Sequence, residues 1–255
     1  MITSTANQLV KGLARLRIRR HRDTTGQFLI EGRRPLTMAD SAGVGIIQQL
    51  ICRELGGEPL VADVPQIELS EAPFRKISVR QNPDGVIGVA TQLDTRLEGL
   101  DTPSQPLILL VESIEKPGNL GAMLRTADAV GVGAVIVATP TTDVHNPNVV
   151  RASQGALFTV PLAVGTRNRA LEWLREREIR LVASTPAGEV GLWEANLAGP
   201  VAIAVGSEAQ GVSSELLAAA DQRLVIPMEG AVDSLNASVS AAVLLYEAAR
   251  QRNQS

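Results

Sequence analysis

The chain contains very little cysteine, histidine or aromatic residue. Cys52 is the single cysteine among 255 residues, which excludes an internal disulfide and favours a reducing, cytoplasmic setting. His21 and His145 are the only histidines, so we expect no metal site built from His and Cys. Aromatic residues make up 2% of the chain, which argues against a protein that stacks nucleobases on aromatic platforms.

Several functional signatures are missing as well. No apolar run is long enough to span a membrane, and the N-terminus lacks the order of a signal peptide. The Walker pattern and the G-x-G-x-x-G fingerprint do not follow the first strand of the C-terminal region. Paired carboxylates and the Ser-His and Cys-His dyads are absent too. These absences disfavour membrane proteins, nicotinamide-dependent oxidoreductases and common hydrolases.

The charge of the chain is unevenly distributed. The net charge is −3, yet basic residues gather near the N-terminus. This segment is either a phosphate-binding footprint or the solvated face of a surface helix, and the residues alone do not decide between them. The candidates for RNA contacts are Arg15, Arg17, Arg19, Arg20, Arg22 and Arg33.

The N-terminal third has the pattern of a small α/β domain. We expect an amphipathic helix over residues 5–20, another over 35–42, and strands at 28–30, 46–51 and 85–90. Residues 1–93 therefore form one predicted domain. Charge, glycine and two prolines identify residues 94–105 as the linker to a second domain, residues 106–255.

The second domain alternates apolar strands with helices. We expect strands at 107–111, 134–138, 180–184 and 201–205, and a last strand ending at Met228. A helix closes at Gly131, and the core face of the terminal helix is predicted to be Val239, Val243 and Tyr246. Continuous apolar strands alternating with helices predict a parallel sheet that is covered on both faces.

Polar residues and glycines follow these strands, at the edge where parallel sheets bind ligands. Asn119 and Arg125 come after the first strand, Glu208 lies between Gly206 and Gly211, and residues 234–236 precede the terminal helix. Taken singly, each is explained as a helix cap, an ion pair or a turn residue. Their convergence on one sheet edge indicates a site.

Three motifs carry a family resemblance. They are GNLGAMLRT at residues 118–126, GSEAQG at 206–211 and SLNASVS at 234–240. In this order they resemble the three motifs of the SpoU (TrmH) RNA 2′-O-ribose methyltransferases of the SPOUT superfamily. More weakly, FLIEG at 28–32 and QNPDGV at 81–86 resemble the L30e-like substrate-binding domain of many members.

The resemblance implies a parallel-sheet SPOUT domain with a deep trefoil knot, preceded by a small α/β L30e-like domain. It also implies a homodimer, S-adenosylmethionine as methyl donor and no metal. The implied catalytic set is Asn119, Arg125, Glu208, Ser234 and Asn236. The implied cofactor-binding set is Ser184, Thr185, Val205, Gly206, Gly211, Ile226, Met228 and Leu235.

The implied reaction is methylation of a ribose 2′-hydroxyl, with ribosomal RNA expected as the substrate. The same reaction on transfer RNA is an alternative, and so is a non-catalytic, ribosome-associated RNA-binding or assembly protein. The family's candidate for handling the hydroxyl proton is Arg125. Because a guanidinium stays protonated in nearly any site, Arg125 could instead clamp the neighbouring phosphate.

Overall fold

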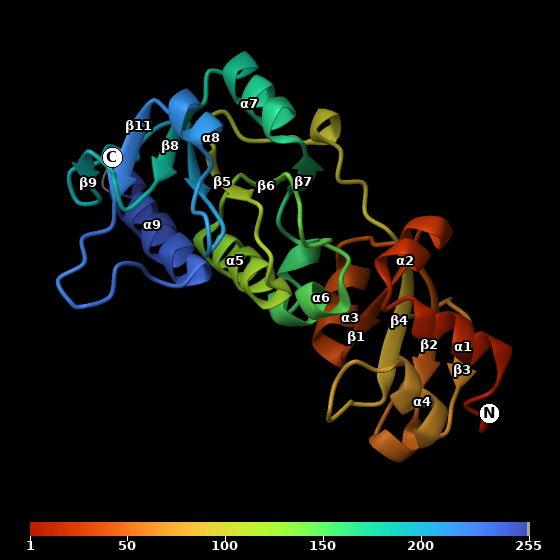
Figure 1. Cartoon of the computed structure of the whole chain (residues 1–255). Helices are drawn as coiled ribbons and strands as arrows, with labels where there is room; N and C mark the ends of the chain where they lie inside the picture. Colours follow the sequence, from red (N-terminus) through yellow and green to blue (C-terminus); the bar gives the residue numbers. More distant parts are fainter. Residues whose placement is uncertain (254–255) are drawn as a thin grey trace. The chain divides into compact units, whose positions relative to one another are not determined.

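The computed structural model describes residues 1–253, which form two compact units (Figure 1). Unit 1 comprises Met1–Leu93 together with Asp143–Thr159, and unit 2 comprises Asp94–Thr142 and the chain from Val160 onward. The segment Asp143–Thr159 thus packs with unit 1, although it lies within the sequence range predicted for the second domain. Residues 94–105 contain the short 3-10 helix Leu97–Gly99, and Leu97 is buried in the core of unit 2.

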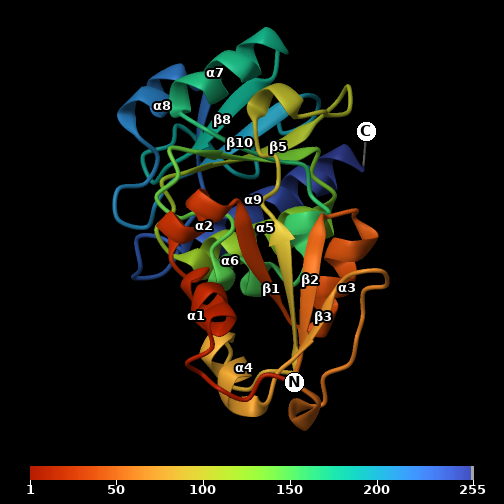
Figure 2. The same cartoon turned by 90° about the vertical axis from the view of Figure 1, so that its right-hand side faces the viewer.

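Unit 1 is a four-stranded sheet with helices packed on it (Figure 2). The sheet order is β1-β4-β2-β3, with β4 antiparallel to both of its neighbours and β3 parallel to β2. The elements are α1 (Gln8–Arg15), α2 (Arg19–Thr25), β1 (Gln27–Glu31), α3 (Arg33–Ser41), β2 (Ile46–Ile51), β3 (Gln66–Glu68), α4 (Glu71–Ile77), β4 (Val86–Thr91) and α6 (Pro147–Ser153).

The prediction of one helix over residues 5–20 is wrong. Asn7 caps the N-terminus of α1 by accepting the Leu9 N–H, and α1 ends at Arg15. The Leu16 carbonyl then accepts a hydrogen bond from Arg22 Nη1 at 2.8 Å, and α2 begins at Arg19. Burial of the Arg22 side chain under this turn separates the two helices.

Unit 2 contains the predicted parallel sheet. All its strand pairs are parallel, in the order β7-β6-β5-β10-β8-β11-β9. The elements are β5 (Leu107–Glu112), α5 (Pro117–Val130), β6 (Ala134–Ala138), β7 (Leu162–Gly165), α7 (Arg167–Glu176), β8 (Arg180–Ser184), β9 (Val190–Gly191), β10 (Val201–Val205), α8 (Ser214–Ala219), β11 (Gln222–Val225) and α9 (Ala237–Arg252). The predicted strands 107–111, 134–138, 180–184 and 201–205 are confirmed to within one residue.

Helices cover both faces of this sheet, as predicted. Helices α5 and α9 lie side by side against one face, and α7 and α8 cover the other (Figure 1). The central strands β5, β6 and β10 are buried along their whole length because they are covered on both sides. Gly131 ends α5 in the left-handed conformation at φ 74°, as its position predicted.

The predicted core face of α9 is wrong. Val239 and Tyr246 are 46% and 57% exposed, whereas Leu244, Leu245 and Ala248 are buried. The helix carries apolar residues on more than one face, so periodicity alone could not tell which face packs against the sheet. One apolar stripe of α9 is therefore left at the surface of unit 2.

Candidate active site

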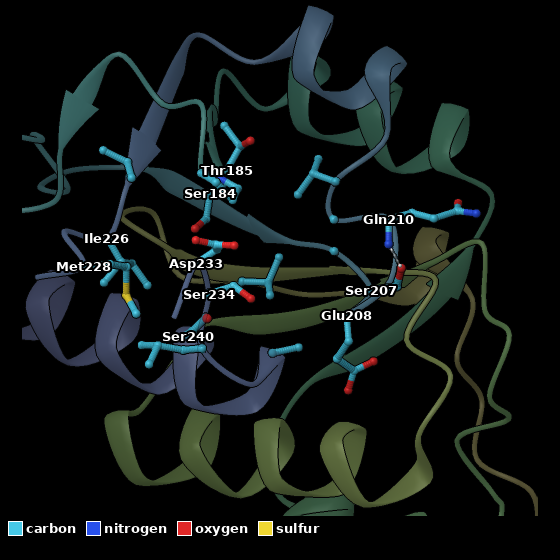
Figure 3. A pocket seen from close by; sticks show the side chains of 18 of the residues that line it. Ser184, Thr185, Ser207, Glu208, Gln210, Ile226, Met228, Asp233, Ser234 and Ser240 are labelled. Atoms are coloured by element: carbon cyan, nitrogen blue, oxygen red, sulfur yellow. Dashed lines mark hydrogen bonds between the residues drawn. The ribbon is translucent and has the colours of Figure 1, made fainter. Parts of the chain in front are cut away.

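A pocket of about 750 Å³ opens at the edge of unit 2 beyond the carboxyl ends of β8, β10 and β11 (Figure 3). The loops after these strands and the N-terminus of α9 form its walls. Eight lining residues are those of the predicted cofactor set: Ser184, Thr185, Val205, Gly206, Gly211, Ile226, Met228 and Leu235. The structure thus brings together residues that are up to 51 positions apart in the sequence, from Ser184 to Leu235.

The turn after β10 requires glycine. A Cβ at Gly206 would lie 1.9 Å from the Gly211 carbonyl oxygen, so no side chain fits there. Gly211 has a φ of 66°, and its N–H donates to the Ser207 carbonyl at 2.9 Å. Inside this turn, Ser207 Oγ accepts the Gln210 N–H at 3.2 Å (Figure 3). The glycines therefore let the backbone itself form one wall of the pocket.

A buried carboxylate anchors the far end of this turn. Glu112, the last residue of β5, accepts the Ser213 N–H and the Ser213 hydroxyl, both at 2.8 Å. Arg167 lies 3.3 Å from the same carboxylate. The Ser213 hydroxyl also caps α8 by accepting the Leu216 N–H. Sequence reasoning missed Glu112; an acidic residue that ends an otherwise apolar strand was the available signal.

Three of the five predicted catalytic residues form one hydrogen-bonded chain. Asn119 Nδ2 donates to Glu208 Oε1, and Asn236 Nδ2 donates to Asn119 Oδ1 at 3.3 Å. Asn236 Oδ1 accepts the Ser238 N–H and so caps α9. The chain links the N-terminal turns of α5 and α9 to the turn after β10. Glu208 lines the pocket, and Figure 3 shows its side chain extending toward α5.

The other two predicted catalytic residues lie apart from this chain. Ser234 lines the pocket and sits beside Asp233, which also points into it (Figure 3). Arg125 is exposed on α5 and is not among the residues that line the pocket. Sequence reasoning also missed Asp233 and Ser240 as pocket residues; Asp233 directly precedes the third motif and Ser240 is its last residue, and that position was the available signal.

The predicted RNA-contacting arginines have different environments in unit 1. Arg15, Arg17, Arg19 and Arg20 are exposed, although Arg17 Nε donates to the Ile77 carbonyl at 3.1 Å and Arg19 lies 3.7 Å from Asp23. Arg33 is half-buried; its N–H donates to Asp84 at 3.0 Å and its guanidinium to the Gly56 carbonyl.

Arg22 does not lie at the surface, as its place among the predicted RNA-contacting arginines requires. It is 1% exposed, and its Nε donates to Asp143 Oδ2 at 2.9 Å. Burial alone would raise the pKa of the Asp143 carboxyl, but hydrogen bonds from His145 and Arg22 outweigh burial and hold it well below its usual range. Because its guanidinium is enclosed and paired, Arg22 cannot reach an RNA phosphate. Its role is to fasten the segment that begins at Asp143 to unit 1.

Comparison with known proteins identifies the family to which this fold and pocket belong. Residues 106–246 match the SpoU rRNA Methylase family, and residues 7–88 match the MRM3-like substrate binding domain. The chain belongs to the SpoU rRNA methylase family.

Several relatives of this SpoU family member match it along nearly its whole length. A crystal structure of an RNA 2′-O ribose methyltransferase is 46% identical, covers 98% of both chains and superposes with a TM-score of 0.87. An AdoMet-bound rRNA methyltransferase from Sinorhizobium meliloti is 29% identical over 98% of this chain and 97% of its own, with a TM-score of 0.89. The 23S rRNA (guanosine(2553)-2′-O)-methyltransferase RlmP of Bacillus subtilis is 29% identical over 96% of this chain and 97% of its own.

In this SpoU family member, the described residues include no group of three or more His, Cys, Asp or Glu that could hold a metal ion. Among the same residues, no helix is both long and apolar enough to cross a membrane.

Proposed function

We propose that this protein transfers a methyl group from S-adenosylmethionine to a ribose 2′-hydroxyl of ribosomal RNA. The observation that carries the proposal is the single pocket lined by all eight residues of the predicted cofactor set. The hydrogen-bonded chain through Asn119 stands next to that pocket. Relatives named as 23S rRNA 2′-O-methyltransferases support ribosomal RNA over transfer RNA as the substrate.

The residues of the pocket suit the proposed cofactor. Its volume of about 750 Å³ is within the range of small-molecule sites. Apolar side chains of Val205, Ile226 and Leu235 offer contacts to an adenine ring, and hydroxyls of Ser184 and Thr185 offer hydrogen bonds. S-adenosylmethionine, when bound, supplies a methyl group on an activated sulfonium, so the protein's task is to align the nucleophile and remove its proton.

We propose that the hydrogen-bonded chain aligns the ribose 2′-hydroxyl and that Arg125 binds the neighbouring RNA phosphate. The carboxylate of Glu208 fixes the Asn119 amide, and Asn119 fixes Asn236, so the turns around the pocket share one geometry. Ser234 is placed at the pocket wall to contact the ribose. Arg125 clamps a phosphate bidentately and leaves a phosphate oxygen or a water to accept the hydroxyl proton.

A homodimer would bring Arg125 to a pocket. Arg125 is exposed on α5, which packs beside α9, and α9 presents Val239 and Tyr246 to the surface. Exposed apolar stripes of this kind mark contacts with another protein surface. We propose that a second copy covers the stripe and that each subunit's Arg125 serves the pocket of its partner.

The deep trefoil knot of unit 2 and the predicted domain boundaries remain predictions.

The function is tested by methyl incorporation. Radiolabelled S-adenosylmethionine is incubated with the protein and either 23S ribosomal RNA or transfer RNA from cells that lack the gene. We expect label in 23S RNA, at a single ribose that mapping of alkali-resistant linkages identifies. Label in transfer RNA only would replace the substrate, and no label with either RNA would contradict the proposal.

The cofactor site is tested by titration calorimetry with S-adenosylmethionine. Gly206→Val forces a side chain into the space of the Gly211 carbonyl, so we expect affinity to fall by about a hundredfold or more. Gly230→Ala is the matched control, because Gly230 also lines the pocket and has open space at its Cβ position. Equal affinities for the two variants would remove the turn after β10 from the cofactor site.

The shared site is tested by mixing inactive subunits. At an S-adenosylmethionine concentration too low to saturate Gly206→Val, Arg125→Ala and Gly206→Val proteins should each be nearly inactive, but a mixed dimer has one subunit with an intact pocket and a partner with an intact Arg125. Random mixing then restores about a quarter of the wild-type methyl transfer, since half of the dimers carry one working site of two. No recovery after verified subunit exchange means that Arg125 serves its own subunit.

A further inference from the structure

A second depression, of about 400 Å³, lies on unit 1 and is not part of the pocket described above. The side of α1, the start of α2 and the first residues of β1 and β2 enclose it. We refer to it as the α1 groove. All of its lining residues belong to unit 1.

The walls of the α1 groove combine unused amides with exposed apolar side chains. Gln8, Gln27 and Gln48 line it, and within residues 1–253 none of their side chains hydrogen-bonds to another protein group. Leu9 and Ile47 are 37% and 36% exposed, so both present apolar surface to the groove. The groove therefore offers flat apolar contacts together with donors and acceptors that have no internal partner.

A β-bulge turns two successive residues of β2 toward the groove. Successive side chains of a regular strand point to opposite faces, yet Ile47 and Gln48 both line the groove. Pairing between β2 and β4 shifts register between Ile46 and Gln48, so Ile47 is the extra residue. Bulges of this kind re-aim side chains at functional sites.

Gly12 is a helical glycine that the fold does not require. It lies within α1, its φ is not positive, and a Cβ there would meet nothing within 4 Å. Glycine within a helix is less favourable than alanine, so local stability does not explain its presence. Gly12 does line the α1 groove, and a long side chain at this position would fill it.

Positive charge surrounds the groove. Lys11 and Arg15 follow Gln8 and Gly12 by three positions in α1, which makes them neighbours on the helix surface, and Arg20 precedes His21. All three basic side chains are exposed. Residues 1–26 contain six Lys and Arg and one acidic residue, Asp23. The rim is therefore suited to a polyanion.

We propose that the α1 groove holds one unpaired nucleobase of the RNA substrate. Unstacked bases of single-stranded RNA are recognised through apolar contact with their faces and hydrogen bonds to their edges. Leu9 and Ile47 contact the faces, the three glutamine amides bind the edges, and Lys11, Arg15 and Arg20 bind the flanking phosphates. This inference rests on the proposed function, because it names the element of the RNA that unit 1 grips.

The test compares RNA with and without bases. Full-length protein is titrated with fluorescein-labelled single-stranded decamers of U, A or C and with an abasic ribose-phosphate decamer of the same length. We expect at least one base-containing decamer to bind the wild type about tenfold more tightly than the abasic one, because a base buries apolar surface against Leu9 and Ile47. In Gly12→Leu this preference disappears, while affinity for the abasic decamer and its salt dependence stay unchanged.

A matched pair of variants separates filling of the groove from damage to the helix. Gly12→Ala gains the same helix propensity but leaves most of the groove open, so it should bind like the wild type. Arg15→Gln with Arg20→Gln should weaken binding of both kinds of decamer and reduce the salt slope. A preference for bases that survives in Gly12→Leu, or no preference in the wild type, overturns the proposal.

Methyl transfer to 23S RNA distinguishes this inference from the proposed function. Gly12→Leu should raise KM for the RNA about tenfold and leave kcat and S-adenosylmethionine affinity unchanged. If the wild type methylates RNA and Gly12→Leu matches it in both assays, the α1 groove alone is wrong. If the wild type does not methylate RNA at all, the proposed function fails whatever the decamers show.

Discussion

The pocket of unit 2 and the basic segment of unit 1 were both predicted from short stretches of sequence, with different success. In the pocket, Gly206, Met228 and Leu235 meet because turns after parallel strands open on the same edge of the sheet. The basic segment also carries several candidate residues close together in the sequence, but one of them, Arg22, is buried and paired with Asp143. Residues that a backbone turn requires therefore predict their place in the fold better than the number of nearby charges predicts which arginines are exposed.

The reason is physical. The turn after β10 admits no side chain at Gly206, so it can adopt few conformations. The glycines in its sequence therefore predict its backbone geometry. An arginine in a charged helix has a long flexible side chain, and whether it faces solvent depends on acids elsewhere in the chain. The partner of Arg22 is 121 positions away, and no local pattern indicates it.

The largest expected effect concerns Arg125. Arg125→Ala should lower methyl transfer by about a thousandfold, because the RNA phosphate loses its clamp at the reacting ribose. Affinity for S-adenosylmethionine should be unchanged, since the proposed contact of Arg125 is the RNA phosphate and Arg125 is not among the residues that line the pocket. A methyl-incorporation assay and calorimetry measure the two quantities. Retained activity would refute the role assigned to Arg125. It would also mean that family motifs predict functional residues no better than clusters of charge do.

The second prediction breaks the buried pair of unit 1. Arg22→Met should lower the free energy of unfolding by about 3–5 kcal/mol, because it leaves the Asp143 carboxylate buried without its partner. Asp143→Asn in the same chain should recover part of the loss. Denaturant unfolding measures both. If Arg22→Met weakened RNA binding with no change in stability, Arg22 would return to the RNA-contacting set.

The same pair has a predicted pH dependence. The pKa of Asp143 is lowered in the folded protein, so the carboxylate stabilises it above the unfolded pKa of about 3.9. That contribution is lost as the pH falls below this value toward the folded pKa. Thermal unfolding between pH 6 and pH 3 should show less acid destabilisation in Asp143→Asn than in the wild type. Equal slopes would mean that other carboxylates account for the dependence.

The third prediction tests the hydrogen-bonded chain beside the pocket. Asn119→Asp places two carboxylates together, and kcat should fall about tenfold or more while cofactor affinity holds. Adding Glu208→Gln restores a donor–acceptor pair with the roles exchanged, so the double variant should recover part of kcat. A double variant no better than Asn119→Asp would show that Glu208 acts through its charge.

The smallest expected effect concerns the exposed basic residues. Neutralising Arg17, Arg19 and Arg20 together should weaken RNA binding about fivefold to tenfold at low salt and flatten its salt dependence. Filter binding across a series of salt concentrations measures both. An unchanged slope would make these residues ordinary surface and would leave unit 2 as the main RNA contact.

Much of unit 2 could be predicted from the sequence, and less of unit 1. Buried strands such as β5 and β10 are continuous apolar runs, and glycines mark the turns that follow them. The pairing of Glu112 with Ser213 could not be predicted, because the two residues are 101 positions apart. The exposed face of α9 was missed because its apolar residues surround the helix.

The cofactor assignment of this pocket can be checked by a crystal structure with S-adenosylhomocysteine, the demethylated donor. We expect the ligand to lie in the pocket, in contact with Gly206, Met228 and Leu235, with its sulfur facing the side on which Asn119 and Glu208 lie. A ligand bound elsewhere on the chain, with these three residues out of contact, would contradict it.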